Sequence, residues 1–174
     1  MKKMISLNHD AVIFDESKWK VPPRPDTVFT IEQTSIFKRS PEDVFEFCID
    51  GRNYQKIFPE PIEPVPGFNE MIVRHNHVYS FKHWMKHFIP VTWLVYIPEY
   101  EHNKKYVDMQ LNGFFRYFRH IHECEPVPDG TLYRDKVEFR SYFPELVDAY
   151  ITQNELQKIF ILRHQNMRRL LHNE

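Results

Sequence analysis

Hydrophobic and polar residues alternate along two segments in the C-terminal half of the chain, residues 114–124 and 132–142. A period of two is typical of β-strands, because successive side chains point to opposite faces of a sheet. The segment between them, 125–131, contains two prolines and an Asp-Gly pair and predicts a turn. The pattern therefore predicts a β-hairpin. The residues that share one face of this hairpin are Phe118, His120, His122 and Cys124 on the first strand and Tyr133, Asp135, Val137 and Phe139 on the second.

The position of the turn sets which residues of the two strands face each other. With a turn centred on 127–128, His122 is predicted opposite Tyr133, and His120 opposite Asp135. This register places a polar group among aromatic side chains.

Two short helices are predicted after a first strand over 27–39. Ser40 is a favourable N-cap for the first helix, and Pro41 suits the first helical position. The second helix, over 52–58, ends where Pro59 begins a proline-rich segment.

A long helix is predicted at the C-terminal end, over 144–172. Hydrophobic residues recur there at helical spacing, and acidic residues near its start and basic residues near its end complement the helix dipole. Further strands of an antiparallel meander are predicted over 73–84, 92–97 and 104–111.

Three segments are predicted to lack regular structure. Residues 1–26 end in three prolines and form an extended N-terminal arm. The prolines of 59–67 exclude helix and strand. Residues 83–90 mix apolar and basic side chains and predict a loop beside a cavity mouth or a membrane surface, or a plain loop with buried aromatic residues.

Four stretches of the C-terminal half resemble one superfamily in sequence. They are Gly113 to Phe115, Phe118 to His122, Asp129 to Thr131 and Asp135 to Phe139. This pattern resembles the START-like, or SRPBCC, superfamily of polyketide cyclase and lipid-transport domains. The resemblance implies an α+β helix-grip fold over residues 27–174, in which a curved antiparallel sheet wraps around the long C-terminal helix. It also implies a cavity between sheet and helix.

The amino-acid composition restricts the kinds of molecule that the protein is expected to bind. Fifteen Phe, nine Tyr and three Trp in 174 residues suit an aromatic-lined cavity, or simply an aromatic-rich core. The formal net charge of −1 gives no basic surface for nucleic acid. No apolar run reaches the length of a membrane span, and no signal peptide is recognisable. Two cysteines without a disulfide pattern fit a reducing compartment, so a soluble cytoplasmic protein is expected.

The hairpin face and its neighbours supply the candidate ligand-binding residues. The expected set is Trp93, Asp108, Gln110, Phe118, His120, His122, Tyr133, Asp135, Val137, Phe139 and Phe160. A carboxylate beside an imidazole raises the histidine pKa and fixes its tautomer. That arrangement suits the anchoring of a polar ligand group, general acid–base catalysis by His120 and Asp135, or only the pairing of buried polar groups.

No metal and no cofactor are expected from the sequence. The pairs His75/His77 and His120/His122 each put two imidazoles on one strand face, but a site needs further ligands from elsewhere in the chain. Only four glycines are present, so neither a phosphate-binding loop nor a dinucleotide fingerprint is formed. No nucleophile elbow occurs.

Three functions remain open on this reasoning. The first is binding of a small hydrophobic molecule, such as a lipid, quinone, polyketide or aromatic compound. The second is a cofactor-independent cyclase or dehydratase that uses His120 and Asp135. The third is a protein–protein interaction module. The oligomeric state is left open.

Overall fold

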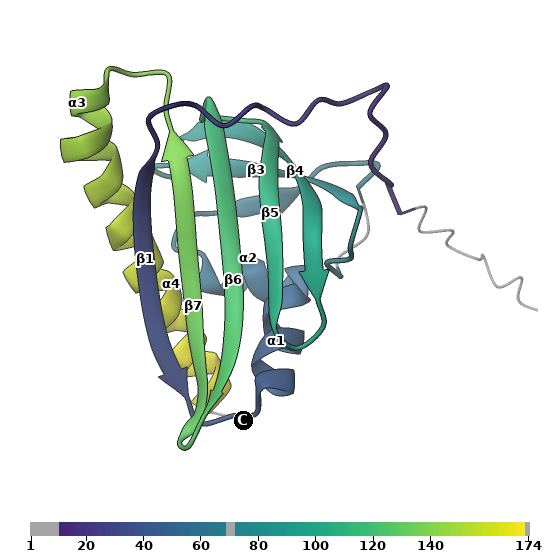
Figure 1. The fold of residues 1–174 in the computed structure, drawn as a ribbon, viewed down its shortest axis with the longest axis vertical. Helices are drawn as coiled ribbons and strands as arrows, with labels where there is room; N and C mark the ends of the chain where they lie inside the picture. Colours follow the sequence, from purple (N-terminus) through teal and green to yellow (C-terminus); the bar gives the residue numbers. More distant parts are fainter. Residues whose placement is uncertain (1–10, 69–71, 173–174) are drawn as a thin grey trace, which may run out of the picture.

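The computed structural model describes residues 11–68 and 72–172 of the chain. Within this part, seven strands form one antiparallel sheet in the order β1-β7-β6-β5-β4-β3-β2. Figure 1 shows the sheet curving away from β1, with the C-terminal helix lying along the β1 side. The two short helices lie near the C-terminal end of that helix. This is the α+β helix-grip fold that the sequence predicts. The strands are β1 (Phe29–Phe37), β2 (Ile62–Pro64), β3 (Val78–Met85), β4 (Ile89–Glu101), β5 (Lys105–Asn112), β6 (Tyr117–Val127) and β7 (Gly130–Arg140).

The helices begin at the predicted signals. In α1 (Pro41–Ile49), the Ser40 hydroxyl accepts a hydrogen bond from the Asp43 backbone N–H at 3.1 Å. The second short helix is α2 (Gly51–Ile57). The terminal helix comprises α3 (Glu145–Val147), the π-helical segment η1 (Asp148–Thr152) and α4 (Gln153–His172). The π-helical segment was not predicted, since periodicity does not distinguish it from α-helix.

The β6–β7 hairpin has the predicted face but a different register. His122 pairs with Asp135, and His120 pairs with Val137, so the predicted pairing is wrong by two residues. The strands end at Val127 and start again at Gly130, which centres the turn one residue later than expected. Gly130 has φ +131°, and a Cβ there would lie 2.1 Å from the Phe37 carbonyl oxygen, so glycine fixes the turn at this position.

Two segments that were expected to be irregular contain strand. Ile62–Pro64 forms β2 despite the surrounding prolines, because β2 pairs only with β3 at the edge of the sheet, where a missing N–H is tolerated. Residues 83–90 form the end of a hairpin between β3 and β4. Lys86 and His87 turn the chain with φ of 52° and 66°, a conformation usually signalled by Gly or Asn.

The core divides into two clusters along the C-terminal helix. One lies beneath α1 and α2 and includes Phe37, Val44 and Met167. The other lies between the sheet and the first turns of α4 and includes Val137 and Leu156. The helix therefore covers β1 and β7 closely and leaves the inner face of the later strands to other elements.

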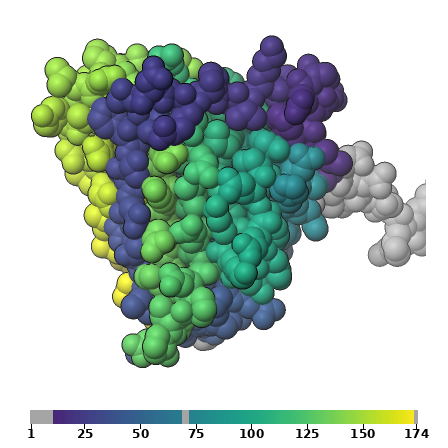
Figure 2. All heavy atoms as spheres, viewed as in Figure 1, coloured from purple at the N-terminus to yellow at the C-terminus, as the bar shows by residue number. Residues whose placement is uncertain are grey.

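The described part of the predicted arm, residues 11–26, lies on the outer face of the sheet. The Phe14 N–H donates to the Asn76 carbonyl oxygen at 2.9 Å, and its ring stacks on Tyr96 with centroids 4.0 Å apart. Figure 2 shows the arm passing across one end of the strands toward β1. Among the described helices, none has the length and apolar character needed to cross a membrane.

Candidate ligand cavity and its polar cluster

A cavity of about 350 Å³ lies between the inner face of β3 to β6 and the helical elements α2, η1 and α4. Most of its wall is aromatic or aliphatic. The apolar side chains that line it include Tyr54, Phe58, Phe81, Trp93, Val95, Ile97, Phe115, Phe118, Leu156 and Phe160. A volume of this size falls within the range of small-molecule sites.

The cavity opens beside the start of the terminal helix. Phe143 and Ile151 both line the cavity and are 48% and 59% exposed, so this part of the wall meets solvent. Lys86 from the β3–β4 turn forms an ion pair with Glu155 of α4, and both residues also line the cavity. A side-chain bridge thus connects the β3–β4 hairpin to the helix at the cavity wall.

Six of the eleven residues predicted to bind a ligand line this cavity. They are Trp93, Asp108, Phe118, His120, His122 and Phe160. The other five, Gln110, Tyr133, Asp135, Val137 and Phe139, do not. Gln110 turns its amide back to the Phe115 backbone, accepting from its N–H and donating to its carbonyl oxygen.

The four residues of β7 lie on the expected face but under the helix. Tyr133, Asp135, Val137 and Phe139 are all fully buried. Because α4 packs over β1 and β7, the hollow part of the inner face begins at the next strand in the sheet, β6. The sequence pattern gives the face of a strand but not the lateral position of the helix that covers it.

Sequence reasoning missed the cavity residues that come from β3 and α2. Tyr79, Phe81 and His83 alternate along β3 on the cavity side, a period-two signal that was available in the segment 78–85. Tyr54 and Phe58 come from α2 and the residue after it, where a short helix carries little pattern.

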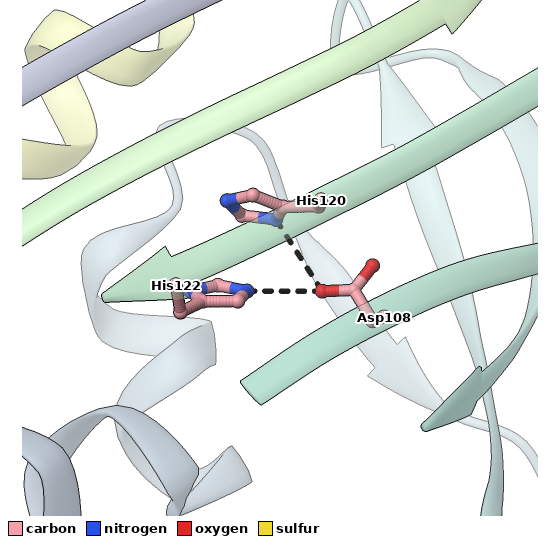
Figure 3. Close-up of side chains that lie close together, drawn as sticks. All are labelled: Asp108, His120 and His122. Carbon is pink, nitrogen blue, oxygen red and sulfur yellow. Dashed lines mark hydrogen bonds and ion pairs between the residues drawn. The ribbon is translucent and has the colours of Figure 1, made fainter. Parts of the chain in front are cut away.

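Three polar residues of the cavity wall form a tight cluster on β5 and β6. Asp108 pairs with His120 across the two strands, and His122 lies one alternate position further along β6. The Asp108 Oδ2 atom is 2.9 Å from His122 Nε2 and 3.4 Å from His120 Nδ1. Figure 3 shows the three side chains converging on the space between the strands.

A second carboxylate, Asp135, holds the histidines from the buried side. Its Oδ1 atom is 3.0 Å from His120 Nε2 and 3.0 Å from His122 Nδ1, and it accepts a hydrogen bond from the Tyr133 hydroxyl at 2.7 Å. Its Oδ2 atom accepts from Arg163 Nε at 2.8 Å and is 3.1 Å from His164 Nε2. Asp135 therefore has five polar partners on its two oxygens.

The charges of the cluster perturb one another. Burial opposes ionisation of Asp135, but Arg163 and His120 outweigh it and hold the Asp135 pKa well below its usual range. Burial alone would lower the pKa of His120, but Asp108 and Asp135 outweigh it and raise that pKa. Burial and the neighbouring His120 lower the pKa of His122. The pKa values of the two imidazoles thus shift in opposite directions, although both rings have Asp108 and Asp135 as neighbours.

Aromatic rings fix the two imidazoles in place. His122 stacks on Tyr106 with centroids 3.9 Å apart and an interplanar angle of 11°. The ring of His120 meets Phe160 edge to face at 5.0 Å and 89°. These contacts restrict the orientation of both imidazole rings and so of their nitrogen atoms.

Two other polar groups belong to the cavity. His83 Nε2 is 2.6 Å from Glu60 Oε2, and burial lowers the pKa of His83 despite this carboxylate. The indole Nε1 of Trp93 is buried and has no hydrogen-bond partner among the described residues. Burial also raises the pKa of the Cys48 thiol in the cavity wall to about 12.

Comparison with known proteins shows similarity in structure rather than in sequence. No protein-family profile and no curated protein matches the chain. Protein CV1439 from Chromobacterium violaceum has a similar structure, with a TM-score of 0.66 at 13% identity over 82% of this chain and 96% of that one. A START superfamily protein from Mycobacterium smegmatis matches with a TM-score of 0.62 at 12% identity over 83% and 97%. Ara h 8.0201 matches with a TM-score of 0.56 at 15% identity over 81% and 99%.

These similarities cover nearly the whole length of each known structure. The chain has a START-like helix-grip fold, as the sequence resemblance implied. At such identities the likeness extends to the fold and not to a particular ligand or reaction.

Proposed function

We propose that this protein binds a small, largely apolar molecule in the cavity between β3 to β6 and the helices. The observation that carries the proposal is a cavity of about 350 Å³ with a mostly apolar wall and a few convergent polar groups. A ligand that buries about 200 Å² of apolar surface there gains about 5 kcal/mol from its removal from water, before the cost of association.

The polar groups of the wall fit a ligand with one polar end. Asp108, His120 and His122 provide hydrogen-bonding atoms at one place in the wall. A hydroxyl or carbonyl oxygen would satisfy such groups, while the aromatic rings contact the apolar body. The START-like superfamily includes lipid-transport domains, and this supports a lipid, quinone, polyketide or aromatic compound as the ligand class.

Binding is tested with the fluorescent probe 1-anilinonaphthalene-8-sulfonate, excited directly, and a pair of matched variants on β4. Val95→Trp adds bulk to the cavity wall, whereas Thr92→Trp adds the same side chain on the exposed outer face of the same strand. We expect Val95→Trp to weaken probe binding at least ~10-fold, which is about 1.4 kcal/mol, and Thr92→Trp to leave it unchanged. Equal affinity of both folded variants and the unsubstituted protein would rule out this cavity as the site.

A cyclase-like or dehydratase-like reaction is the second candidate. His120 lies in the cavity wall with both ring nitrogens near carboxylate oxygens, and this favours a role in moving a proton to or from a bound substrate. An enzyme of this kind would lose turnover of a poly-β-ketone substrate in His120→Gln but would retain binding of the naphthalene probe. A binding protein would show affinity without turnover.

A further inference from the structure

We propose that Asp108, His120 and His122 form a binding site for one divalent transition-metal ion, of the Zn²⁺ or Fe²⁺ type, at the wall of the cavity. From the sequence alone, two imidazoles were expected on one strand face, and a metal was not expected for lack of further ligands. The register of β5 against β6 supplies that ligand, because it sets Asp108 opposite His120.

The distances from the Asp108 oxygen to the two imidazole nitrogens suit a common metal ion. One donor atom from each residue lies within 4.8 Å of the other two. Two donors bound to one ion at about 2.1 Å lie about 3.0 to 3.4 Å apart at octahedral or tetrahedral angles. The Asp108 oxygen lies 2.9 and 3.4 Å from the two imidazole nitrogens, close to these values.

Asp135 and Tyr133 set the tautomers that a metal site requires. His120 Nε2 donates its N–H to Asp135 Oδ1 at 3.0 Å. His122 Nδ1 lies 2.8 Å from the Tyr133 hydroxyl oxygen, which itself donates to Asp135, so His122 donates its N–H to that oxygen. The lone pairs of the opposite nitrogens, His120 Nδ1 and His122 Nε2, then point toward Asp108. A carboxylate that receives the second N–H of a ligating histidine is the usual support of protein metal sites.

The balance of charge also favours a cation between Asp108 and the histidines. Asp135 is neutralised by Arg163, whose Nε donates to it at 2.8 Å. Among the described residues, the ion pairs of Asp108 are with the two histidines alone. Within the described chain no Lys or Arg pairs with Asp108, so a divalent cation bound between its oxygen and the two ring nitrogens would balance its charge.

The donor set narrows the kind of ion. Two imidazole nitrogens and one carboxylate oxygen suit Zn²⁺, Fe²⁺ and related ions, whereas Mg²⁺ and Ca²⁺ prefer oxygen donors. Three protein ligands leave at least one coordination position toward the cavity, where all three residues lie. A water molecule or an oxygen atom of a cavity ligand would complete the coordination shell.

The alternative is a cluster held together by hydrogen bonds without a metal ion. Titration with Co²⁺ distinguishes this hydrogen-bonded cluster from a metal site. Chelator-treated, tag-free protein is titrated with Co²⁺ and followed by its visible absorption, with Zn²⁺ as a competitor. We expect one Co²⁺ per chain, displaced by one Zn²⁺. Absence of stoichiometric binding, or binding that is not displaced by Zn²⁺, would overturn the proposal.

Matched variants locate the ion. Loss of a supporting residue costs 10- to 100-fold in metal affinity, so Asp108→Asn, which removes a direct ligand, is expected to cost on the order of 100-fold or more. The control is the double variant His75→Gln/His77→Gln, which replaces a histidine pair of the same spacing outside the cavity, exposed at His75 and half-buried at His77, and is expected to leave affinity unchanged. Equal affinity of Asp108→Asn and the unsubstituted protein, or loss in the control, would contradict the site.

A measurement on the unsubstituted protein keeps the proposal falsifiable if Asp108→Asn fails to fold. In the Co²⁺ form, paramagnetically shifted NMR signals are expected from two histidine rings. Any other number of ligating histidines overturns the assignment. The proposal goes beyond the binding of an apolar molecule, and its test uses no such molecule, so failure of either one leaves the other standing.

Discussion

Asp108 and Asp135 flank the same two histidines from opposite sides, and their surroundings differ. Asp135 is fully buried beneath the terminal helix and has five polar partners, among them the guanidinium of Arg163. Asp108 lies in the wall of the cavity, its side chain is 19% exposed, and its ion-pair partners within the described chain are the two histidines. Asp135, with five polar partners and no exposure, is therefore suited to stabilising the fold. Asp108, which is partly exposed in the cavity wall, can also bind a further group.

The same contrast separates the two halves of the inner sheet face. Over β1 and β7 the helix packs closely, and the side chains of β7 on that face are fully buried. Over β3 to β6 the aromatic side chains leave a cavity. The closely packed side and the hollow side therefore lie next to each other on one sheet face, and the hollow side has room for a ligand.

The largest expected effect is on the free energy of unfolding of Asp135→Asn. Removal of its charge leaves Arg163 buried without an anionic partner, which costs about 3 to 5 kcal/mol. Asp108→Asn is the matched control and is expected to cost about 1 kcal/mol, since it breaks hydrogen bonds at the cavity wall only. Urea denaturation of both variants measures the difference, and equal losses would remove the distinction between the two carboxylates.

A smaller difference is expected between two truncations on the same helix. Met167 is fully buried in the cluster beneath α1 and α2, and Met167→Ala is expected to cost about 4 kcal/mol because it creates a new void. Leu156 borders the existing cavity, so Leu156→Ala is expected to cost about 2 kcal/mol, close to the transfer free energy of the side chain alone. If thermal or chemical denaturation gave Leu156→Ala the greater cost, the cavity side would be the better packed one.

The smallest expected effect is a dependence of stability on alkaline pH that comes from Cys48. Its thiol has a pKa of about 12 in the folded protein, against 9.0 as the ordinary value, because burial disfavours the thiolate. Below pH 9 both states hold the proton, and stability is unaffected. As the pH rises above 9 only the unfolded state ionises, so about 1.4 kcal/mol of stability is lost by pH 10.

The variant Cys48→Ala removes this contribution. The change in its free energy of unfolding between pH 8 and pH 10 should be smaller than that of the unsubstituted protein by about 1.4 kcal/mol. An identical change in the two proteins would mean that the Cys48 thiol ionises as readily in the folded state as in the unfolded one.

The sequence predicted most of the architecture because its signals are local. The alternation on β6 and β7 gave the correct faces, and Ser40 and Pro41 gave the correct start of α1. The predicted register of the hairpin was wrong because a turn rich in Pro, Asp and Gly has several possible centres. The observed turn position depends on the close approach of Gly130 to Phe37, which is distant in sequence.

The candidate site was predicted only in part, because local patterns place residues on a strand face but do not set how strands and helices pack. Period two brought His120 and His122 to one face, but the position of Asp108 beside them depends on the β5–β6 register. Val137 and Phe139 were expected in the cavity wall and lie under α4, because helix placement is a tertiary property. Tyr54 and Phe58 reach the cavity from a short helix whose packing no local pattern specifies.

An apolar ligand is proposed to bind on the hollow side of the sheet, between β3 to β6 and the helices, and not on the closely packed side beneath α1 and α2. The most direct measurement is an NMR titration of isotope-labelled protein with 1-anilinonaphthalene-8-sulfonate. We expect chemical-shift changes to concentrate at cavity residues such as Val95, Ile97 and Leu156, while the signals of Val44 and Met167 in the packed cluster stay unchanged. Changes confined to the outer face of the sheet, or spread evenly over both clusters, would contradict this proposal.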